Sequence, residues 1–474
     1  MQADHSEFEA VEDYWFPEEL ERVGAAPTVR RVGQWLFFSA QVPRSRHTGA
    51  AIQSLQQLPS AAAAELSTVE HHDARLGPVK AQTWTIFDNV SHILGRLGCS
   101  LDDVIRQRIF LRHARDVPPV EEVLLSFYRD ELPATTFGVI ASKGLHKDYD
   151  VFVEVVALAP HDGGLTRQNV DIAELEAVTR PYPQAVRVGQ LLFTSGILGI
   201  TEQTGRVATN LGVVDARWRS TLVRNQYHTD SSQEPLKAQA ALIYSHLEQI
   251  LGSQGASLAD IVRTNFLTSV GDMAAWWAWQ PLRQHTYLSS ENAPASTALH
   301  VPQVTSDPDA VVVCDAVALI PGAWRKGAAG PPEGSPSYLP MAQKAGPFLF
   351  TSGLVGFDKA SHRATRSFAE LTDEGARYLG LSRSDDTEAI MAQAWQAYSA
   401  IGQALNAGGS DPSRVLHQSI GMRDLSHYAV LERVAQRFFA GRLPPTTVVG
   451  IDDTGPHPHE ALFEIDAVAW TGNG

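Results

Sequence analysis

Two glutamates stand inside apolar runs of the chain. Glu154 lies in VFVEVVALAP and Glu464 in LFEIDAVAW, and both runs are typical of buried strands. Burial desolvates a carboxyl group and tunes its pKa for proton transfer near neutral pH. Glu154 and Glu464 are therefore candidate catalytic acid–base groups. The alternative is a structural glutamate at a sheet edge or an interface, paired with a cationic side chain.

Three serines follow a second kind of apolar run. Ser39, Ser195 and Ser352 end the runs WLFFS, LLFTS and FLFTS, and a glycine or alanine comes next. The hydroxyl and backbone N–H groups of such a turn can hold a ligand oxygen, although Ser-Gly is also an ordinary turn sequence. The three serines are therefore candidate substrate-binding residues, with a simple turn as the alternative.

These residues recur because the chain contains three copies of one unit. The opening motif is VRRVGQWLFFSAQVP from Val29, VRVGQLLFTSGILG from Val186 and QKAGPFLFTSGLVG from Gln343. An Ala-Gln pair follows in each copy, and an apolar strand closes the copy. Three landmarks in fixed order, at a period of about 155 residues, indicate a repeat. The predicted boundaries of the copies are 1–160, 161–322 and 323–474.

Within a copy, the pattern predicts an α+β unit. Apolar residues at helical spacing follow the Ala-Gln landmark, as in residues 238–251. A strand, a second amphipathic helix and two closing strands come next. The second helix is expected at about 118–128, 273–287 and 425–439. The order β-β-α-β-α-β-β implies a mixed sheet with two helices on one face.

Composition narrows the class of protein. The 474 residues are 44% hydrophobic and 19% charged, as in a globular protein, and no run of 18 apolar residues occurs. The net charge of −15 argues against nucleic acid as a partner, and we expect no membrane partner either. An acidic N-terminal stretch without an apolar segment does not indicate export.

Cofactor and metal sites are not expected. The two cysteines, Cys99 and Cys314, lie in different copies without a CxxC partner, which favours a reducing cytoplasm over a disulfide framework or a zinc site. The chain has neither a GxGxxG nor a Walker A phrase. We therefore predict a cytoplasmic protein that needs no cofactor and no metal.

Several phrases in fixed order resemble the RidA/YjgF family, the reactive intermediate deaminases. They are PYPQAVRVGQLLFTSG, KAQAALIYSHLEQILGSQGASLADIVRTNFL and VCDAVAL, and the resemblance covers nearly the whole chain in three tandem copies. Family members are homotrimers whose sheets form a central barrel, with ligand clefts between subunits. The resemblance implies a single-chain pseudo-trimer with a central β-barrel and three clefts that are free to diverge.

The resemblance also implies where a substrate would bind. In the family, an arginine after the second helix clamps a substrate carboxylate through a bidentate pair. The corresponding phrases here are LPATTFGV, APASTALHV and LPPTTVVGI, which place Thr135, Ser296 and Thr446 at the arginine position. These three hydroxyl residues are candidate substrate-binding residues, and no copy keeps the clamp.

Two further functional positions of the family are matched in only some of the three copies. The family glutamate that orients the attacking water is matched to Glu154 and Glu464, whereas the second copy has Val313 there, with Asp315 two residues on. The ring-stacking tyrosine matches Tyr182 alone. A working site is therefore expected to combine Tyr182 of one copy with a glutamate of the next.

The lost arginine and retained glutamates set the functional expectation. We expect an enzyme of specialised metabolism that acts on a small reactive imine, enamine or polyene-aromatic precursor, by proton transfer, cyclisation or water addition, at an inter-repeat cleft. The alternatives are an imine deaminase with a substitute cation such as Arg112 or Arg423, a chorismatase-like hydrolase, and a non-catalytic binding or scaffold protein. A homodimer of pseudo-trimers also stays open.

Overall fold

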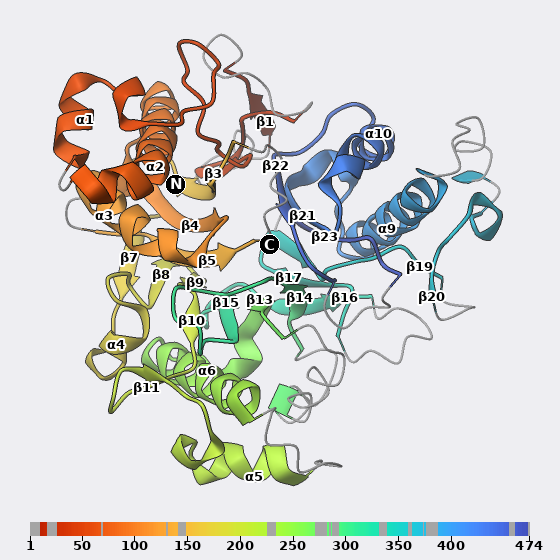
Figure 1. The fold of residues 1–474 in the computed structure, drawn as a ribbon. Helices are drawn as coiled ribbons and strands as arrows, with labels where there is room; N and C mark the ends of the chain where they lie inside the picture. Colours follow the sequence, from red (N-terminus) through yellow and green to blue (C-terminus); the bar gives the residue numbers. More distant parts are fainter. Residues whose placement is uncertain are drawn as a thin grey trace.

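In the described part of the chain, three large sheets each carry helices on their outer side, and two small two-stranded sheets accompany them (Figure 1). Of the 474 residues, the computed structural model describes 10–16, 26–67, 70–128, 131–140, 148–224, 234–270, 282–283, 286, 293–330, 339–358, 363–372, 374–375, 387–454 and 460–472. Within these ranges, no helix is both long and apolar enough to cross a membrane.

The first unit contains a mixed six-stranded sheet of order β1-β2-β3-β6-β4-β5. Its strands are β1 (Val11–Tyr14), β2 (Val29–Val32), β3 (Trp35–Phe38), β4 (Val104–Leu111), β5 (Ala134–Val139) and β6 (Val151–Leu158). Strand β4 is parallel to β5 and antiparallel to β6. Its helices are α1 (Ser60–Leu66), α2 (Glu70–Arg96) and α3 (Val117–Phe127).

The second unit repeats this order as β7-β8-β9-β15-β13-β14. Its strands are β7 (Arg167–Val170), β8 (Ala185–Val188), β9 (Leu191–Thr194), β10 (Ile197–Leu198), β13 (Ile261–Thr268), β14 (Ala295–His300) and β15 (Val312–Leu319), with the small pair β11 (Ile200–Thr201) and β12 (Arg206–Val207). Its helices are α4 (Glu176–Thr179), α5 (Ala216–Arg224) and α6 (Glu234–Ser253). The second helix expected at 273–287 falls mostly outside the described residues.

The third unit has the order β16-β17-β18-β23-β21-β22. Its strands are β16 (Lys326–Ala329), β17 (Ala342–Ala345), β18 (Phe348–Thr351), β21 (Val415–Met422), β22 (Thr446–Gly450) and β23 (Phe463–Trp470), with the small pair β19 (Phe357–Asp358) and β20 (Arg363–Ala364). Its helices are α9 (Glu388–Ala407) and α10 (Tyr428–Phe438). The mixed α+β architecture is as expected, with one extra strand at the start of each unit.

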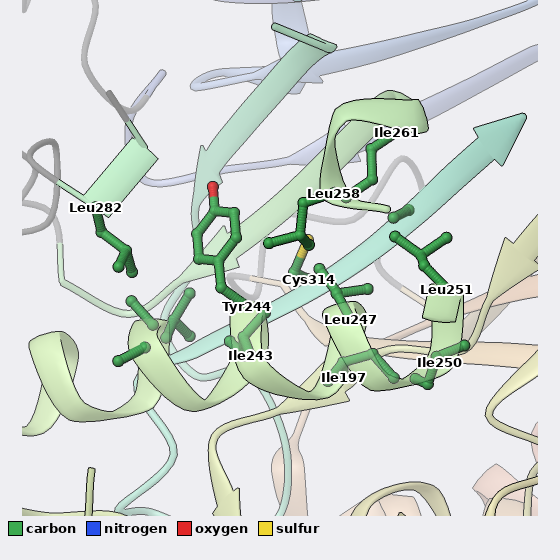
Figure 2. Packing of buried hydrophobic residues seen from close by; sticks show 14 of the residues in the cluster. Ile197, Ile243, Tyr244, Leu247, Ile250, Leu251, Leu258, Ile261, Leu282 and Cys314 are labelled. Atoms are coloured by element: carbon green, nitrogen blue, oxygen red, sulfur yellow. The ribbon is translucent and has the colours of Figure 1, made fainter. Parts of the chain in front are cut away.

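Each unit has its own helix-to-sheet core. In the second unit, Ile243, Leu247 and Ile250 recur at helical spacing on α6 and are fully buried. Figure 2 shows α6 side chains beside the strand that carries Cys314, in a cluster that also contains Leu282. This packing explains why the stretch after the Ala-Gln landmark forms a helix.

The three sheets also share a central apolar cluster. Trp35 of β3, Phe193 of β9 and Phe348 of β18 meet there, and the ring centroid of Trp35 is 5.9 Å from that of Phe193 and 5.0 Å from that of Phe348. A second shared cluster contains Phe110, Leu267 and other residues of all three units. The inner faces of the three sheets therefore pack on one another.

The expectation of a closed central β-barrel is wrong. The described strands form separate sheets, and neighbouring sheets are joined by isolated bridges such as Val139 with Gln303 and His300 with Asp453. A closed barrel requires a continuous hydrogen-bonded ladder around its circumference. Here the edge strands β5, β14 and β22 meet a turn of the next unit instead of a full strand.

Candidate functional site

The serine turns join one unit to the next. In each case the serine hydroxyl accepts a hydrogen bond from a backbone N–H of the neighbouring unit. The pairs are Ser195 with Thr135 at 3.0 Å (the 1/2 interface), Ser352 with Ser296 at 3.1 Å (the 2/3 interface) and Ser39 with Thr446 at 3.1 Å (the 3/1 interface). Six of the candidate substrate-binding residues thus meet in pairs, one pair at each interface.

The same hydroxyls also hold their own units together. Each serine donates to a proline carbonyl 12 residues earlier, at 2.6 Å for Ser195, 2.6 Å for Ser352 and 2.7 Å for Ser39. The residue after each serine donates its N–H to the carbonyl of the partner residue across the interface. These contacts support a structural role for the turns, alongside any role in holding a ligand.

In the first and third units, the side-chain amide of a glutamine contacts the residue that stands at the position of the family arginine. Thr135 Oγ1 accepts a hydrogen bond from Gln107 Nε2 at 3.1 Å, and Thr446 Oγ1 accepts one from Gln418 Nε2 at 3.0 Å. Each glutamine oxygen in turn accepts a hydrogen bond from a buried tyrosine hydroxyl, at 3.1 Å in both units. In both of these units, an uncharged hydrogen-bond network of threonine, glutamine and tyrosine therefore lies at this position.

The second unit places an arginine there instead. Arg283 Nη2 donates to Ser296 Oγ at 2.9 Å, and the residue opposite Ser296 in the sheet is Thr264 in place of a glutamine. The Arg283 side chain is 1% exposed, and its guanidinium carbon lies 5.6 Å from the ring centroid of Phe266. A buried arginine beside the arginine position is a candidate anion-binding group.

Sequence reasoning missed Arg283, because this residue lies in the expected helix and not in the strand phrase. The one indication in the sequence was that Arg283 is a cationic residue within an aromatic, apolar stretch. The substitute cation named from the sequence, Arg112, is held by its own unit, since it pairs with Asp150 at 3.3 Å and donates to the carbonyl of Tyr149 at 2.9 Å. Arg423 stands just beyond the end of β21 in the third unit.

Strand register separates the two glutamates. Glu154 of β6 lies opposite Arg108, at the same position in its strand as Asp315 and Asp466 in theirs. Glu464 lies opposite Gly421, two residues earlier in its strand, so matching Glu464 to Glu154 was wrong. A shift of two residues keeps a side chain on the same face, so alternation could not reveal the offset.

Glu154 belongs to a charged layer between the two shared apolar clusters. We call this set the polar layer: Glu154, Asp315 and Asp466 with Arg106, Arg108, Arg263 and His417, all at most 7% exposed. Each acid is contacted from the preceding unit. The contacts are Arg106 and Arg108 with Asp315, each at 2.8 Å, Arg263 with Asp466, and His417 with Glu154 at 3.9 Å.

Charged neighbours in the polar layer keep Glu154 and Asp315 ionised. Burial alone would raise the pKa of Glu154, but His417, Arg108 and Arg106 outweigh burial and lower that pKa to about 2. In the same way, Arg108 and Arg106 outweigh the burial of Asp315 and lower its pKa to about 2. This direction is opposite to the one expected for a glutamate in an apolar run, and it supports the structural alternative for Glu154.

Glu464 lies at the 2/3 interface. Its side chain is 2% exposed, and a Cβ atom on Gly353 would overlap the Glu464 carboxyl group. The equivalent strand positions hold Phe152 and Val313, which pack in the shared apolar cluster with Phe110 and Leu267. A carboxyl group thus replaces an apolar side chain at this interface, next to the Ser352–Gly353 turn.

Tyr182 lies at a different interface. Its hydroxyl donates to Glu121 Oε1 of α3 at 3.1 Å, and its ring centroid lies 5.8 Å from that of Phe137. Burial raises the pKa of Glu121. Tyr182 therefore belongs to the 1/2 interface, whereas Glu464 belongs to the 2/3 interface, and the structure does not bring the two together.

A small cavity lies where the three units meet. It measures about 30 Å³, room for about two water molecules. Its polar lining is Arg108, Thr136, Asn265, Thr297, Asp315, Ser419, Thr447 and Asp466. Thr136 Oγ1 is buried there without a hydrogen-bond partner. Within the described residues, no group of three or more His, Cys, Asp or Glu side chains is placed to hold a metal ion.

Known proteins resemble parts of this chain. The family model described as Endoribonuclease L-PSP matches residues 25–159. A 3-aminoacrylate deaminase RutC of Acinetobacter baylyi is 33% identical over 91 residues, which cover 19% of this chain and 69% of that protein. A 2-iminobutanoate/2-iminopropanoate deaminase of Dermatophagoides farinae is 30% identical over 64 residues, which cover 13% of this chain and 50% of that protein.

Solved structures with similar folds include a chorismatase. Its TM-score is 0.43 at 14% identity, and the match covers 78% of this chain and 93% of the chorismatase chain. A structure described as a putative endoribonuclease of Klebsiella pneumoniae has a TM-score of 0.27 at 24% identity and covers 28% of this chain and 98% of its own. From the family model and the match to the Acinetobacter deaminase, the chain belongs to the RidA/YjgF family.

Proposed function

We propose that the protein adds water to a small imine or enamine that carries a carboxylate, with release of ammonia, at the 2/3 interface. One observation carries the proposal: this interface combines a buried arginine, Arg283 on Ser296, with a buried carboxyl group, Glu464 beside Gly353. The deaminase names of two relatives agree with this reaction class. In this proposal the three units act as a pseudo-trimer with one working interface.

Arg283 would hold the substrate. A guanidinium group forms charge-assisted hydrogen bonds with a carboxylate, and these bonds strengthen where water is excluded. Arg283 Nη2 already contacts Ser296 Oγ, and the N–H of Ser296 donates to Ser352 Oγ at 3.1 Å. A carboxylate bound by Arg283 would therefore lie close to the turn against which Glu464 packs.

Glu464 would accept and then donate the proton that the reaction moves. Water adds to the carbon of the C=N bond while the Glu464 carboxylate accepts one proton of that water. The carboxylic acid so formed returns the proton to the nitrogen, and collapse of the carbinolamine gives a carbonyl compound and ammonia. An enamine first takes a proton on carbon and loses one from nitrogen, which gives the imine. The sequence of steps consumes one water molecule and needs no cofactor.

Cyclisation of a polyene precursor, the other reaction considered from the sequence, is less well supported. A neutral polyene makes no charge-assisted hydrogen bond with a guanidinium, whereas a carboxylate substrate uses the charge of Arg283 directly. Arg283 thus favours water addition to an anionic substrate.

The test is a coupled assay for ammonia with 2-aminoacrylate and 2-iminobutanoate generated in place. We expect release above the uncatalysed rate, and we expect Arg283→Met to raise KM strongly. Arg112→Met is the matched control, because Arg112 is bound to Asp150 within the first unit. Absence of catalysed release from either compound by the intact chain would overturn the proposal. So would a larger loss in Arg112→Met than in Arg283→Met.

A further inference from the structure

We infer that each chain holds a single ligand site, because the equivalent points of the 1/2 and 3/1 interfaces each hold an uncharged glutamine and an apolar side chain. This inference rests on the proposed function. It goes further by stating how many ligand molecules one chain binds and which residues prevent ligand binding at the other two interfaces.

The first difference lies at the arginine position. The three units place different donors on the equivalent hydroxyl: Gln107 on Thr135, Arg283 on Ser296 and Gln418 on Thr446. An amide is uncharged, and each glutamine oxygen is already bound by a tyrosine hydroxyl. Of these three donors, only the guanidinium of Arg283 carries a full positive charge that can pair with a carboxylate. The 2/3 interface has this charge, and the other two interfaces have a neutral amide there.

The second difference lies two residues before the acid of the polar layer. Phe152 occupies this position at the 3/1 interface, and its ring stacks on Phe110 with a centroid distance of 5.1 Å and an interplanar angle of 22°. Val313 occupies it at the 1/2 interface, where a Cβ atom on Gly196 would lie 3.1 Å from Val313 Cγ2. An apolar side chain thus fills the space that the Glu464 carboxyl group takes at the 2/3 interface.

The two differences coincide at one interface. A cation alone would bind an anion without chemistry, and a carboxyl group alone would repel one. Arg283 and Glu464 occur together, whereas Gln107 faces the interface of Val313 and Gln418 faces that of Phe152. The charged pair therefore marks one site for each chain of three units.

The test is titration calorimetry of the full-length chain with 2-oxobutanoate, the carbonyl product of 2-iminobutanoate hydrolysis. We expect one molecule bound per chain. Arg283→Met should weaken binding at least tenfold, whereas Gln107→Met and Gln418→Met should each leave one site of unchanged affinity. Circular dichroism on each variant checks folding, and Arg283→Lys, which keeps the charge, should retain part of the affinity.

Each outcome decides a separate question. Two or three molecules per chain would overturn the single-site inference while leaving the proposed function standing. One molecule per chain whose binding survives Arg283→Met but not Gln418→Met or Gln107→Met would overturn it too, because the site would lie at another interface. No binding to the unmodified chain would overturn the proposed function, and the inference with it.

Discussion

Glu464 and Glu154 look alike in the sequence but lie in different surroundings. Glu154 lies opposite Arg108 in the polar layer, where its charged neighbours outweigh burial, lower its pKa to about 2 and keep it ionised. Glu464 replaces an apolar residue at the 2/3 interface. A permanently ionised, paired carboxylate is a poor proton shuttle, so the two residues should respond differently to the same substitution.

Replacing Glu464 should remove catalysis without unfolding the chain. We expect Glu464→Gln to lower kcat for ammonia release about 10²- to 10⁴-fold, the usual range for loss of a general acid–base group. Glu154→Gln is the matched change and should lower stability while keeping the rate per folded molecule. Steady-state kinetics with a folded-fraction correction measures both. Equal loss of kcat in the two variants would contradict the distinction.

Asp315 should make the molecule sensitive to acid. Its pKa is about 2 in the folded chain against an ordinary value of 3.8, because Arg108 and Arg106 outweigh the effect of burial. A lowered folded-state pKa adds stability above about pH 3.8, and this stability is lost as the pH falls toward 2. Asp315→Asn should cost about 3–5 kcal/mol at pH 7, because two buried arginines lose their partner.

The pH dependence of the Asp315→Asn effect separates it from a packing defect. The difference in unfolding free energy between the original chain and Asp315→Asn should shrink as the pH falls below about 4, as measured by urea unfolding. Glu248→Gln breaks the exposed pair with Arg217 and should change stability by less than about 1 kcal/mol. A difference for Asp315→Asn that stays constant from pH 7 to pH 3 would refute the assignment.

At the scale of elements, the first strand of a unit helps to fasten it to the preceding one. Arg167 of β7 donates to the carbonyls of Asp102, Val104 and Leu132 in the first unit, at 2.9, 2.8 and 2.9 Å. Lys326 of β16 donates to the carbonyl of Ala259 in the second unit at 2.6 Å. These cations satisfy backbone carbonyls near the start of a strand in the neighbouring sheet.

Loss of the Arg167 side chain should weaken the packing at the 1/2 interface. We expect Arg167→Ala to lower the unfolding free energy by about 1.5–3 kcal/mol, because charged hydrogen bonds to buried carbonyls are lost together. Lys326→Ala removes the cation at the matching place in the third unit and should cost less, since an ammonium group lacks the planar fork of donors that a guanidinium carries. Urea unfolding of both variants compares them. A larger cost for Lys326→Ala would contradict this account.

Elements were more predictable from the sequence than contacts. The helix expected after the Ala-Gln landmark forms as α6, and the strand expected next forms as β13, because apolar periodicity fixes both. The two-residue offset between Glu154 and Glu464 was not predictable, since it preserves alternation. The role of Arg283 was not predicted from the sequence either, because its contact with Ser296 joins a helix to a strand 13 residues away.

At the scale of the molecule, no unit buries its inner face alone. Trp35, Phe193 and Phe348 come from three units and contact one another in the shared cluster. The polar layer adds ion pairs from the first unit to the second and from the second to the third, and a contact between His417 of the third unit and Glu154 of the first. A unit separated from the others would expose a large aromatic patch and leave buried charges unpaired.

Fragments should therefore reassemble but not stand alone. We expect fragment 1–160 by itself to bind a hydrophobic dye and unfold without a cooperative transition, because its inner face, including Trp35, has lost its cover. Mixed with fragment 161–474, it should form a one-to-one complex, seen by size-exclusion chromatography, that no longer binds the dye. The same fragment carrying Arg106→Met and Arg108→Met should associate more weakly, since Asp315 then enters the interface unpaired. A fragment 1–160 that is monodisperse, binds no dye and unfolds cooperatively would show that the shared core is dispensable for the first unit.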